Sequence, residues 1–248
     1  MKISYLPAVR VNVETKDGKP AFFVLRPYSA IPMEELLPRA EQNEVGSLQE
    51  LGERYYFGFG VEKDYEKALA YLKKAAELGA QDAQYLAAEC FRCGYGTKLD
   101  PAEYFTRIQD AAENGSWMAM FNLAAAYREG IEPCDGFGVD ADPKKCFDWS
   151  LEAEKSIRAY WAFYNARNCV DFVETKSRLL KAYYQAGTQL AAHYAEGLGV
   201  TKDLNKALYW LKRTKKFVGT ALGKQDVPLI DKQIDEMNAR IQAETQNL

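Results

Sequence analysis

The sequence contains few of the residues on which most enzymes and metal proteins depend. Among its 248 residues there is one histidine, His193, and there are five cysteines. A mechanism that needs an imidazole base must use His193, and the pattern of the chain fixes no serine or cysteine beside it. The glycines form no phosphate-binding loop, because they fall at regular turns between expected helices. We therefore expect neither catalysis nor a cofactor.

The cysteines are too irregular for a disulfide framework. Their number is odd and their spacing does not recur, for they are Cys90, Cys93, Cys134, Cys146 and Cys169. Cys90 and Cys93 form a CxxC, a spacing that zinc and redox sites use, but no second CxxC supplies the remaining ligands. We interpret the pair as small side chains beside a buried Phe91, and a metal or redox role is the alternative.

The chain has no excess of one charge and no long apolar run. Its 32 basic and 35 acidic residues give a net charge of -3, whereas nucleic-acid binding demands a concentrated basic surface. One basic run, Lys212 to Lys216, is expected at a solvated helix end, with a phosphate or anionic-lipid patch as the alternative. No segment has the pattern of a signal peptide or a membrane span. We expect a cytoplasmic protein that binds neither nucleic acid nor membrane.

What the sequence does contain is a block that recurs. The stretch from Leu51 to Gly79 returns three more times. In the first, second and last copies two glycines keep one spacing, and they are Gly58 and Gly60, Gly94 and Gly96, and Gly197 and Gly199. The third copy has six extra residues before Gly138. Its aspartates, Asp135, Asp140 and Asp142, predict an acidic exposed loop, or a lip on a binding surface.

Each block predicts two helices joined by a short turn. Leu48 and Leu51 lie on one face of a first helix, which Gly58 ends. Asp64 can cap the second helix, whose narrow apolar face begins at Ala68. Neither helix can bury its apolar stripe alone, so successive hairpins are expected to stack side by side.

With this pattern the chain resembles the Sel1-like repeats, relatives of the tetratricopeptide repeats, whose signature is close to LGxxYxxGxGVxxDxxKAxxWYxKAAxxG. The resemblance covers roughly two thirds of the chain. The second copy departs from it at Thr97, Glu103 and Tyr104, and the third lacks the closing KAAxxG. The resemblance implies an all-α fold, a right-handed α-α superhelix, here with a short N-terminal β-hairpin.

We divide the chain accordingly. Residues 1–40 are expected to form a cap, with a β-hairpin turning at Asp17 and Gly18 and a short helix that Pro38 breaks. Residues 218–248 are expected to form a capping helix, with a short coiled coil as the alternative. The solenoid between them spans residues 41–217, with repeats near 44–79, 80–115, 116–155 and 186–217 and longer or degenerate helices over 156–185.

A binding surface is the remaining candidate for function. In stacked hairpins the first helix of each pair lines the concave side, so its residues that face away from the second helix enter a groove. By register these are Glu53, Tyr56, Phe57, Tyr85, Glu89, Arg92, Cys93, Phe121, Arg128 and Glu129, followed in the last copy by Ala192, Ala195 and Glu196. Tyrosine, phenylalanine and arginine are typical anchors of protein interfaces. The same aromatic residues could instead pack between neighbouring repeats.

These features predict a non-catalytic adaptor or scaffold that binds a protein or an extended peptide in the groove, and a monomer is favoured. A narrower version, which the resemblance also implies, is a bacterial immunity or effector-associated protein specific for one partner. The rival class is a carbohydrate or cell-wall binder or hydrolase. It would stack sugars on the aromatic rings and use a carboxylate pair such as Glu89 and Glu129.

Overall fold

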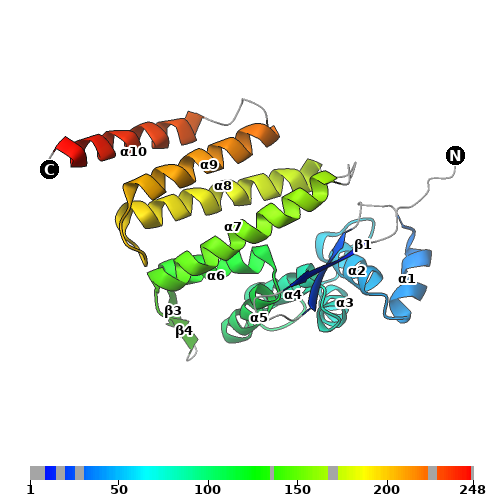
Figure 1. Cartoon of the computed structure of the whole chain (residues 1–248). Coiled ribbons are helices and arrows are strands. Elements are labelled where there is room, and N and C mark those ends of the chain that lie inside the picture. Colours follow the sequence, from blue (N-terminus) through cyan, green and yellow to red (C-terminus); the bar gives the residue numbers. More distant parts are fainter. Residues whose placement is uncertain are drawn as a thin grey trace. The chain divides into compact units, whose positions relative to one another are not determined.

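A computed structural model of the chain describes residues 9–14, 20–25, 31–134, 137–166, 173–222 and 228–246 (Figure 1). These residues form ten α-helices and two small sheets of two strands each. The elements are β1 (Val9–Glu14), β2 (Pro20–Leu25), α1 (Met33–Glu41), α2 (Val45–Phe57), α3 (Tyr65–Glu77), α4 (Gln81–Cys93), α5 (Pro101–Glu113), α6 (Trp117–Glu129), β3 (Ile131–Cys134), β4 (Phe137–Val139), α7 (Pro143–Ala166), α8 (Val173–Glu196), α9 (Leu204–Leu222) and α10 (Pro228–Gln246). The predicted all-α class is confirmed, and so is the N-terminal hairpin.

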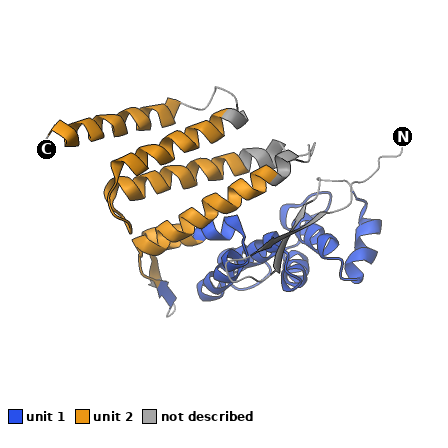
Figure 2. Cartoon of the chain, in the orientation of Figure 1, with its two compact units in different colours: residues 1–122, 134–138 blue, residues 123–133, 139–248 orange. Residues whose placement is uncertain are grey.

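The chain divides into two compact units (Figure 2). The first contains residues 1–122 and 134–138, and the second contains residues 123–133 and 139–248. The boundary falls inside α6, so this helix contributes its first half to one unit and its second half to the other.

In the first unit each helix packs on the next along the chain, from α1 to α5. Its core is built mainly from leucine and alanine of α1 to α4, with Leu36, Leu51 and Leu72 fully buried. Small residues let neighbouring helices approach closely, as the repeated alanines of the sequence predict. Because α1 packs on α2 as α3 packs on α4, we interpret α1 as a shortened second helix placed before the first complete hairpin.

In the second unit α7, α8, α9 and α10 pack in succession. Helices α7 and α8 have 24 residues each, nearly twice the length of the helices in the first unit. The described parts of the segment 156–185 lie in these two helices. Helix α10 places Ile230 and Met237 in buried positions, so its predicted apolar face does pack against the preceding helix.

The turn inside each repeat is held by the same backbone geometry. Gly58 ends α2 in the left-handed conformation, with φ of 79°. The following aspartate, Asp64, caps α3 by accepting a hydrogen bond from the Lys67 amide. In all four copies the amide of this aspartate also donates to the carbonyl of the recurring aromatic residue, and these pairs are Asp64 with Tyr55, Asp100 with Phe91, Asp142 with Tyr127, and Asp203 with Tyr194.

A cation lies over the recurring aromatic ring of each copy. In three copies it is a lysine from the second helix, and the pairs are Lys67 with Tyr55, Lys145 with Tyr127, and Lys206 with Tyr194. The second copy has Glu103 at the position of this lysine. There Arg107, which donates to Glu103 at 2.7 Å, lies 4.8 Å from the centre of the Phe91 ring. The departure from the repeat signature is thus compensated within the same helix.

The second glycine of the turn brings neighbouring hairpins together. A Cβ atom at Gly96 would lie 2.3 Å from the Tyr65 carbonyl oxygen at the start of α3. In the second unit a Cβ atom at Gly199 would lie 2.3 Å from the Pro143 carbonyl oxygen at the start of α7. Gly60, in the first copy, has no described atom within 4 Å of its Cβ position. The glycine is therefore required sterically at Gly96 and Gly199, each of which follows a preceding hairpin.

The six-residue insertion of the third copy forms β3 and β4, which pair with each other. Phe137 of β4 contacts Phe105, with ring centres 5.5 Å apart. Asp142 caps α7 through the amides of Lys144 and Lys145 instead of serving a loop. The side chain of Asp140 is exposed, and Asp135 lies outside the described residues.

Two local predictions were wrong. Pro38 does not break the first helix, because α1 runs through it to Glu41. Proline removes a single N–H donor, and the turn still closes through hydrogen bonds from the Gln42 amide to the Pro38 carbonyl and from the Glu44 amide to the Arg39 carbonyl.

The β1–β2 hairpin pairs Val9 with Leu25 and Glu14 with Pro20, as an antiparallel hairpin should. Its strand β2 lies against α4, and a role as an end cap stays a prediction.

The basic run from Lys212 to Lys216 was also misplaced, since it lies inside α9 and not at its end. Arg213 donates to Glu154 of α7 at 3.0 Å, and Lys215 pairs with Asp231 of α10. The same Glu154 oxygen, Oε1, accepts from Tyr183 of α8 at 2.9 Å. A buried carboxylate therefore ties α7, α8 and α9 together, and two cations of the run hold neighbouring helices.

The glycine geometry makes a quantitative prediction. Gly60→Ala should lower the free energy of unfolding by about 1 kcal/mol, because a side chain is strained in the left-handed conformation. Gly96→Ala should lower it by about 3 kcal/mol, because overlap with the Tyr65 carbonyl adds to the same strain. Urea unfolding followed by circular dichroism measures both values.

Gly199→Ala repeats the test in the second unit and should resemble Gly96→Ala. Equal losses for Gly60→Ala and Gly96→Ala would show that the backbone conformation alone requires these glycines.

Candidate functional site

Of the ten residues predicted to line the groove in the first three copies, eight lie in the first unit, on α2, α4 and the start of α6. They are Glu53, Tyr56, Phe57, Tyr85, Glu89, Arg92, Cys93 and Phe121. Helices α2 and α4 contact each other directly. We call the side of these two helices that carries Tyr56, Phe57, Glu89 and Arg92 the α2–α4 face.

Aromatic rings dominate the α2–α4 face. Tyr56 contacts Phe57, Tyr65 and Tyr95, with ring centres between 4.8 and 5.9 Å apart. Tyr65 and Tyr95 stack on each other at 4.1 Å, and Phe57 contacts Phe59 at 5.3 Å. These five residues, which we call the aromatic cluster, come from α2, the turn after it, the start of α3 and the turn after α4. Rings that hold one another in place lose little freedom when a ligand binds.

The cluster runs from the interior to the surface. Tyr56 packs against the core of the first unit, whereas Phe57 and Phe59 keep 37% and 42% of their surface exposed. Tyr56 of the first copy contacts Tyr95 of the second, and Tyr65 stacks on the same ring. Phe57 and Phe59 retain the exposed surface that a ligand could cover.

Beside the cluster, Glu89 is a buried carboxylate with 6% of its surface exposed. Arg92 donates from both Nε and a terminal nitrogen to the same oxygen, Oε2, at 2.8 and 2.5 Å. This hydrogen bond to Glu89 is the main reason why the pKa of Arg92 lies above its ordinary value. The other oxygen of Glu89, Oε1, is buried and has no hydrogen-bond partner among the described residues.

Tyrosines surround this carboxylate. Burial is the main cause that raises the pKa of both Tyr56 and Tyr104, and the negative charge of nearby Glu89 raises both further. Tyr85 accepts a hydrogen bond at 3.2 Å from Asn122 of α6. The site therefore combines the carboxylate of Glu89, the guanidinium of Arg92 and the phenols of Tyr56 and Tyr104, whose pKa values are raised.

The remaining predicted residues have local partners. Glu53 accepts a hydrogen bond from Gln49 at 2.7 Å, and Phe121 is half-buried on α6. Arg128 and Glu129 belong to the second unit, where both are exposed and pair with each other. In the last copy Ala195 is buried, and Glu196 pairs with Arg240 of α10.

The CxxC lies on α4, next to the site. Cys90 is buried, and burial raises the pKa of its thiol to about 12, while Cys93 is partly exposed. Both thiols are free, as is that of Cys146. Within the described residues no three His, Cys, Asp or Glu side chains are grouped so as to hold a metal ion.

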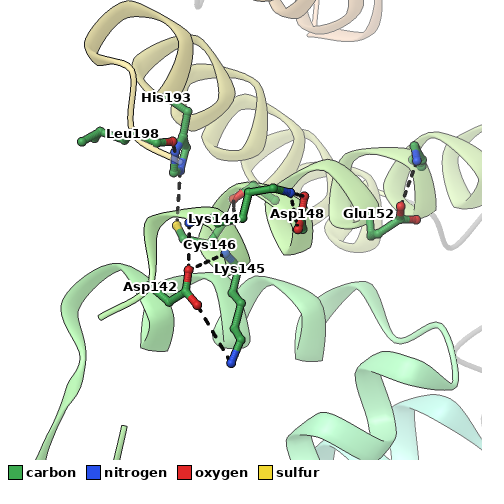
Figure 3. A network of polar contacts seen from close by, with 10 residues as sticks. Asp142, Lys144, Lys145, Cys146, Asp148, Glu152, His193 and Leu198 are labelled. Atoms are coloured by element: carbon green, nitrogen blue, oxygen red, sulfur yellow. Dashed lines mark hydrogen bonds and ion pairs between the residues drawn. The ribbon is translucent and has the colours of Figure 1, made fainter. Parts of the chain in front are cut away.

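The second unit contains a pair that the sequence did not predict. Sγ of Cys146, in the first turn of α7, lies 3.3 Å from Nε2 of His193 in α8 (Figure 3). Nδ1 of His193 lies 2.6 Å from the Leu198 carbonyl oxygen. The repeat pattern fixes no cysteine beside His193, and it could not show this pair, because the two residues are 47 positions apart and meet only when α7 and α8 pack.

The hydrogen bonds of this pair form one directed chain. A carbonyl can only accept, so Nδ1 of His193 carries the proton and donates to Leu198. Nε2 is then an acceptor for the Cys146 thiol, and the Gln189 amide donates to Sγ at 3.2 Å.

This geometry is that of a structural link. Cys146 is fully buried, and burial raises the pKa of its thiol, which opposes the thiolate that a nucleophile requires. The hydrogen bonds of Cys146, His193 and Leu198 join the start of α7 to the turn that follows α8. Asp142, at the N-terminus of α7, caps the first turn of α7 by accepting a hydrogen bond from the Lys145 amide (Figure 3).

Residues that depart from the repeat pattern are the sequence signal that could have indicated these contacts. Tyr104 and Cys146 both occupy the place of Ala68 in the first copy and Ala207 in the last. In each case a larger or polar side chain at a small-residue position reaches a polar residue of a neighbouring helix. Tyr65, Tyr95 and Phe59 were missed because they lie in turns and at a helix start, outside the expected groove helices.

The family model of the Sel1 repeat matches residues 46–79, 81–103, 117–155 and 180–214, which together make up more than half of the chain. The chain belongs to the Sel1 repeat family. The matched segments coincide with the helical hairpins of the structure, the third including the β3–β4 insertion.

Two solved structures are similar to the chain, and the first supports the fold. A Sel1 repeat protein from Oxalobacter formigenes is similar over 82% of this chain and 47% of its own, with 24% identity and a TM-score of 0.60. A protective antigen of uropathogenic Escherichia coli strains, described as displaying an SLR fold, covers 84% of this chain and 48% of its own, with 23% identity and a TM-score of 0.45. The chain thus spans about half the length of each of these structures.

No curated protein matches the sequence significantly. None of the helices within the described ranges has the length and apolar character needed to cross a bilayer.

The Cys146–His193 link predicts slow thiol chemistry. Iodoacetamide at pH 8 should modify Cys146 and Cys90 at least about tenfold more slowly than Cys93, because burial and a raised pKa both remove reactive thiolate. Peptide mass spectrometry over time gives the three rates separately.

The same labelling in urea serves as the control and should make the three rates similar. Modification of native Cys146 as fast as Cys93 would show an accessible, activated thiol and would contradict the structural interpretation of the link.

Proposed function

We propose that this Sel1 repeat protein is a non-catalytic adaptor or scaffold that binds a protein or an extended peptide on the α2–α4 face of its first unit. The observation that carries the proposal is the aromatic cluster, which is anchored in the core and exposed at Phe57 and Phe59. The Sel1 repeat fold is generally used for protein–protein interaction, and this use supports the same reading.

The physical argument concerns what the exposed rings can contribute. Covering the accessible part of two phenylalanine rings removes apolar surface from water at about 25 cal/mol for each Å². The rings already contact one another, so ordering them on binding costs little entropy. Arg92, next to them, keeps 53% of its side chain exposed and can donate to a partner. Aromatic and arginine side chains of this kind are typical centres of protein interfaces.

The chemistry of the face favours binding over catalysis. Glu89 is committed to Arg92 through Oε2, and the nearby tyrosines have pKa values raised above their ordinary value. A raised pKa keeps a phenol protonated at neutral pH, so it cannot act as a base there. The partner can be one dedicated protein, as for an immunity or effector-associated protein, or several.

Substitution of the exposed rings tests the proposal. The double variant Phe57→Ala and Phe59→Ala should weaken partner capture at least about tenfold, because both rings lie at the centre of the proposed contact. Affinity purification from the source cell, with quantification of each captured protein, measures the change.

Leu99→Ala is the matched control, since Leu99 is an exposed apolar residue of the same unit that lies outside the aromatic cluster. It should leave capture unchanged. Undiminished capture by a well-folded double variant would rule out the α2–α4 face. Loss of binding to a polysaccharide column, with no protein captured by the wild type, would instead favour the carbohydrate-binding class.

A further inference from the structure

We propose that the α2–α4 face binds a basic side chain, arginine or lysine, of its partner, and that Glu89 is the residue that receives it. This inference rests on the proposed function and specifies the chemistry of the peptide or protein that the face accepts.

The first observation is the unpartnered oxygen of Glu89. Oε2 accepts both hydrogen bonds from Arg92, while Oε1 is buried without a donor among the described residues. A carboxylate oxygen can accept two hydrogen bonds, and leaving it buried without any is unfavourable. A ligand that donates to Oε1 recovers this free energy on binding.

Comparison of the repeats shows why the oxygen lacks a donor. Glu53 stands at the same place in the first copy, and Gln49 donates to it at 2.7 Å. The second copy has Tyr85 in the place of Gln49, and the Tyr85 hydroxyl group is turned to Asn122 of α6. The internal donor that satisfies the carboxylate of the first copy is therefore replaced in the second.

The surroundings of Glu89 favour a cation over a neutral donor. Tyr56 and Tyr104 lie near enough for the carboxylate to raise the pKa of both, yet neither donates to Oε1. The faces of aromatic rings attract cations, especially where water is excluded. Tyr104 occupies a position that is alanine in the first and last copies, so this arrangement is particular to the second repeat.

The charge of the two helices points the same way. Helices α2 and α4 together contain four carboxylates, Glu50, Glu53, Asp82 and Glu89, and two cations, Arg54 and Arg92. Arg54 is bound to Glu50 at 2.6 Å, and Arg92 is bound to Glu89. The excess negative charge attracts a basic partner and opposes an acidic one.

Arg92 is the exposed member of the pair and Glu89 is the buried one, so a ligand that reaches Glu89 must approach beside Arg92. A guanidinium or ammonium group that enters beside Arg92 donates to Oε1 while Arg92 keeps Oε2. The apolar stem of the incoming residue then lies along the aromatic cluster. Arginine is favoured over lysine because its planar group can stack on a tyrosine ring and donate at the same time.

The experiment is an NMR titration of the full chain with two small probes, Nα-acetyl-arginine amide and Nα-acetyl-citrulline amide. The probes have the same shape, and citrulline lacks the charge. The arginine probe should shift the side-chain carboxyl carbon of Glu89 and bind at least about tenfold more tightly than the citrulline probe. Equal binding of the two probes, or no response of the Glu89 carboxyl carbon, overturns the inference.

Variants separate a binding role from a structural one. Glu89→Gln should abolish the preference for the arginine probe, whereas Arg92→Met, which frees Oε2, should strengthen binding of that probe. Glu77→Gln removes the same charge from an exposed position of α3 and is the control, with no change expected. A residue that served the fold alone would give no gain for Arg92→Met, so this variant decides the matter even if Glu89→Gln is unstable.

The result can also be told apart from failure of the proposed function. If the Phe57 and Phe59 double variant loses its protein partner but the arginine and citrulline probes bind alike, the α2–α4 face is a binding site. In that case the inference that Glu89 receives a basic side chain is wrong. If that double variant retains its partner, the proposed function fails whatever the probes show.

Discussion

The close approach between successive hairpins, at the second glycine of the turn in the second and last copies, is the constraint on which the repeated structure depends. At Gly96 and Gly199 the backbone of one hairpin rests on the first carbonyl of the preceding second helix, with no space for a side chain. This contact fixes the distance between neighbouring hairpins within each unit, and so decides which side chains can meet across them. The polar link between Cys146 of α7 and His193 of α8 joins successive hairpins and depends on that distance.

The repeated parts of the fold could be predicted from the sequence because their cause is local. Gly58 and Asp64 act on the residues next to them, through a left-handed turn and a helix cap, so their recurrence located the hairpins. Contacts between distant residues could not be predicted in this way. Cys146 meets His193, and Arg213 meets Glu154, only because helices of unusual length pack in one register. Pro38 shows the converse, since neighbouring hydrogen bonds offset a strong local preference.

The candidate site was predicted in part, and the reason lies in how repeats diverge. Register identified Tyr56, Phe57, Glu89 and Arg92, because these residues hold equivalent places on first helices. It could not show that the oxygens of Glu89 differ in their partners, or that Tyr104 reaches that carboxylate. Such properties arise where a copy departs from the signature, since positions shared by all copies are used for stacking. Sequence differences among repeats are therefore the better guide to binding chemistry.

The β3–β4 insertion shows that the turn of a repeat can be lengthened while the contacts that hold its hairpin are kept. Asp142 still donates to the Tyr127 carbonyl and still caps α7, although six additional residues lie between Gly130 and the resumed pattern. The hydrogen bond joins Asp142 to Tyr127, and the added residues lie between these two in the sequence. The same turn in another copy is thus a position where a foreign loop could be grafted, with the aspartate and the aromatic carbonyl as its fixed ends. A protein engineer could use this to display a peptide without altering the hairpins on either side.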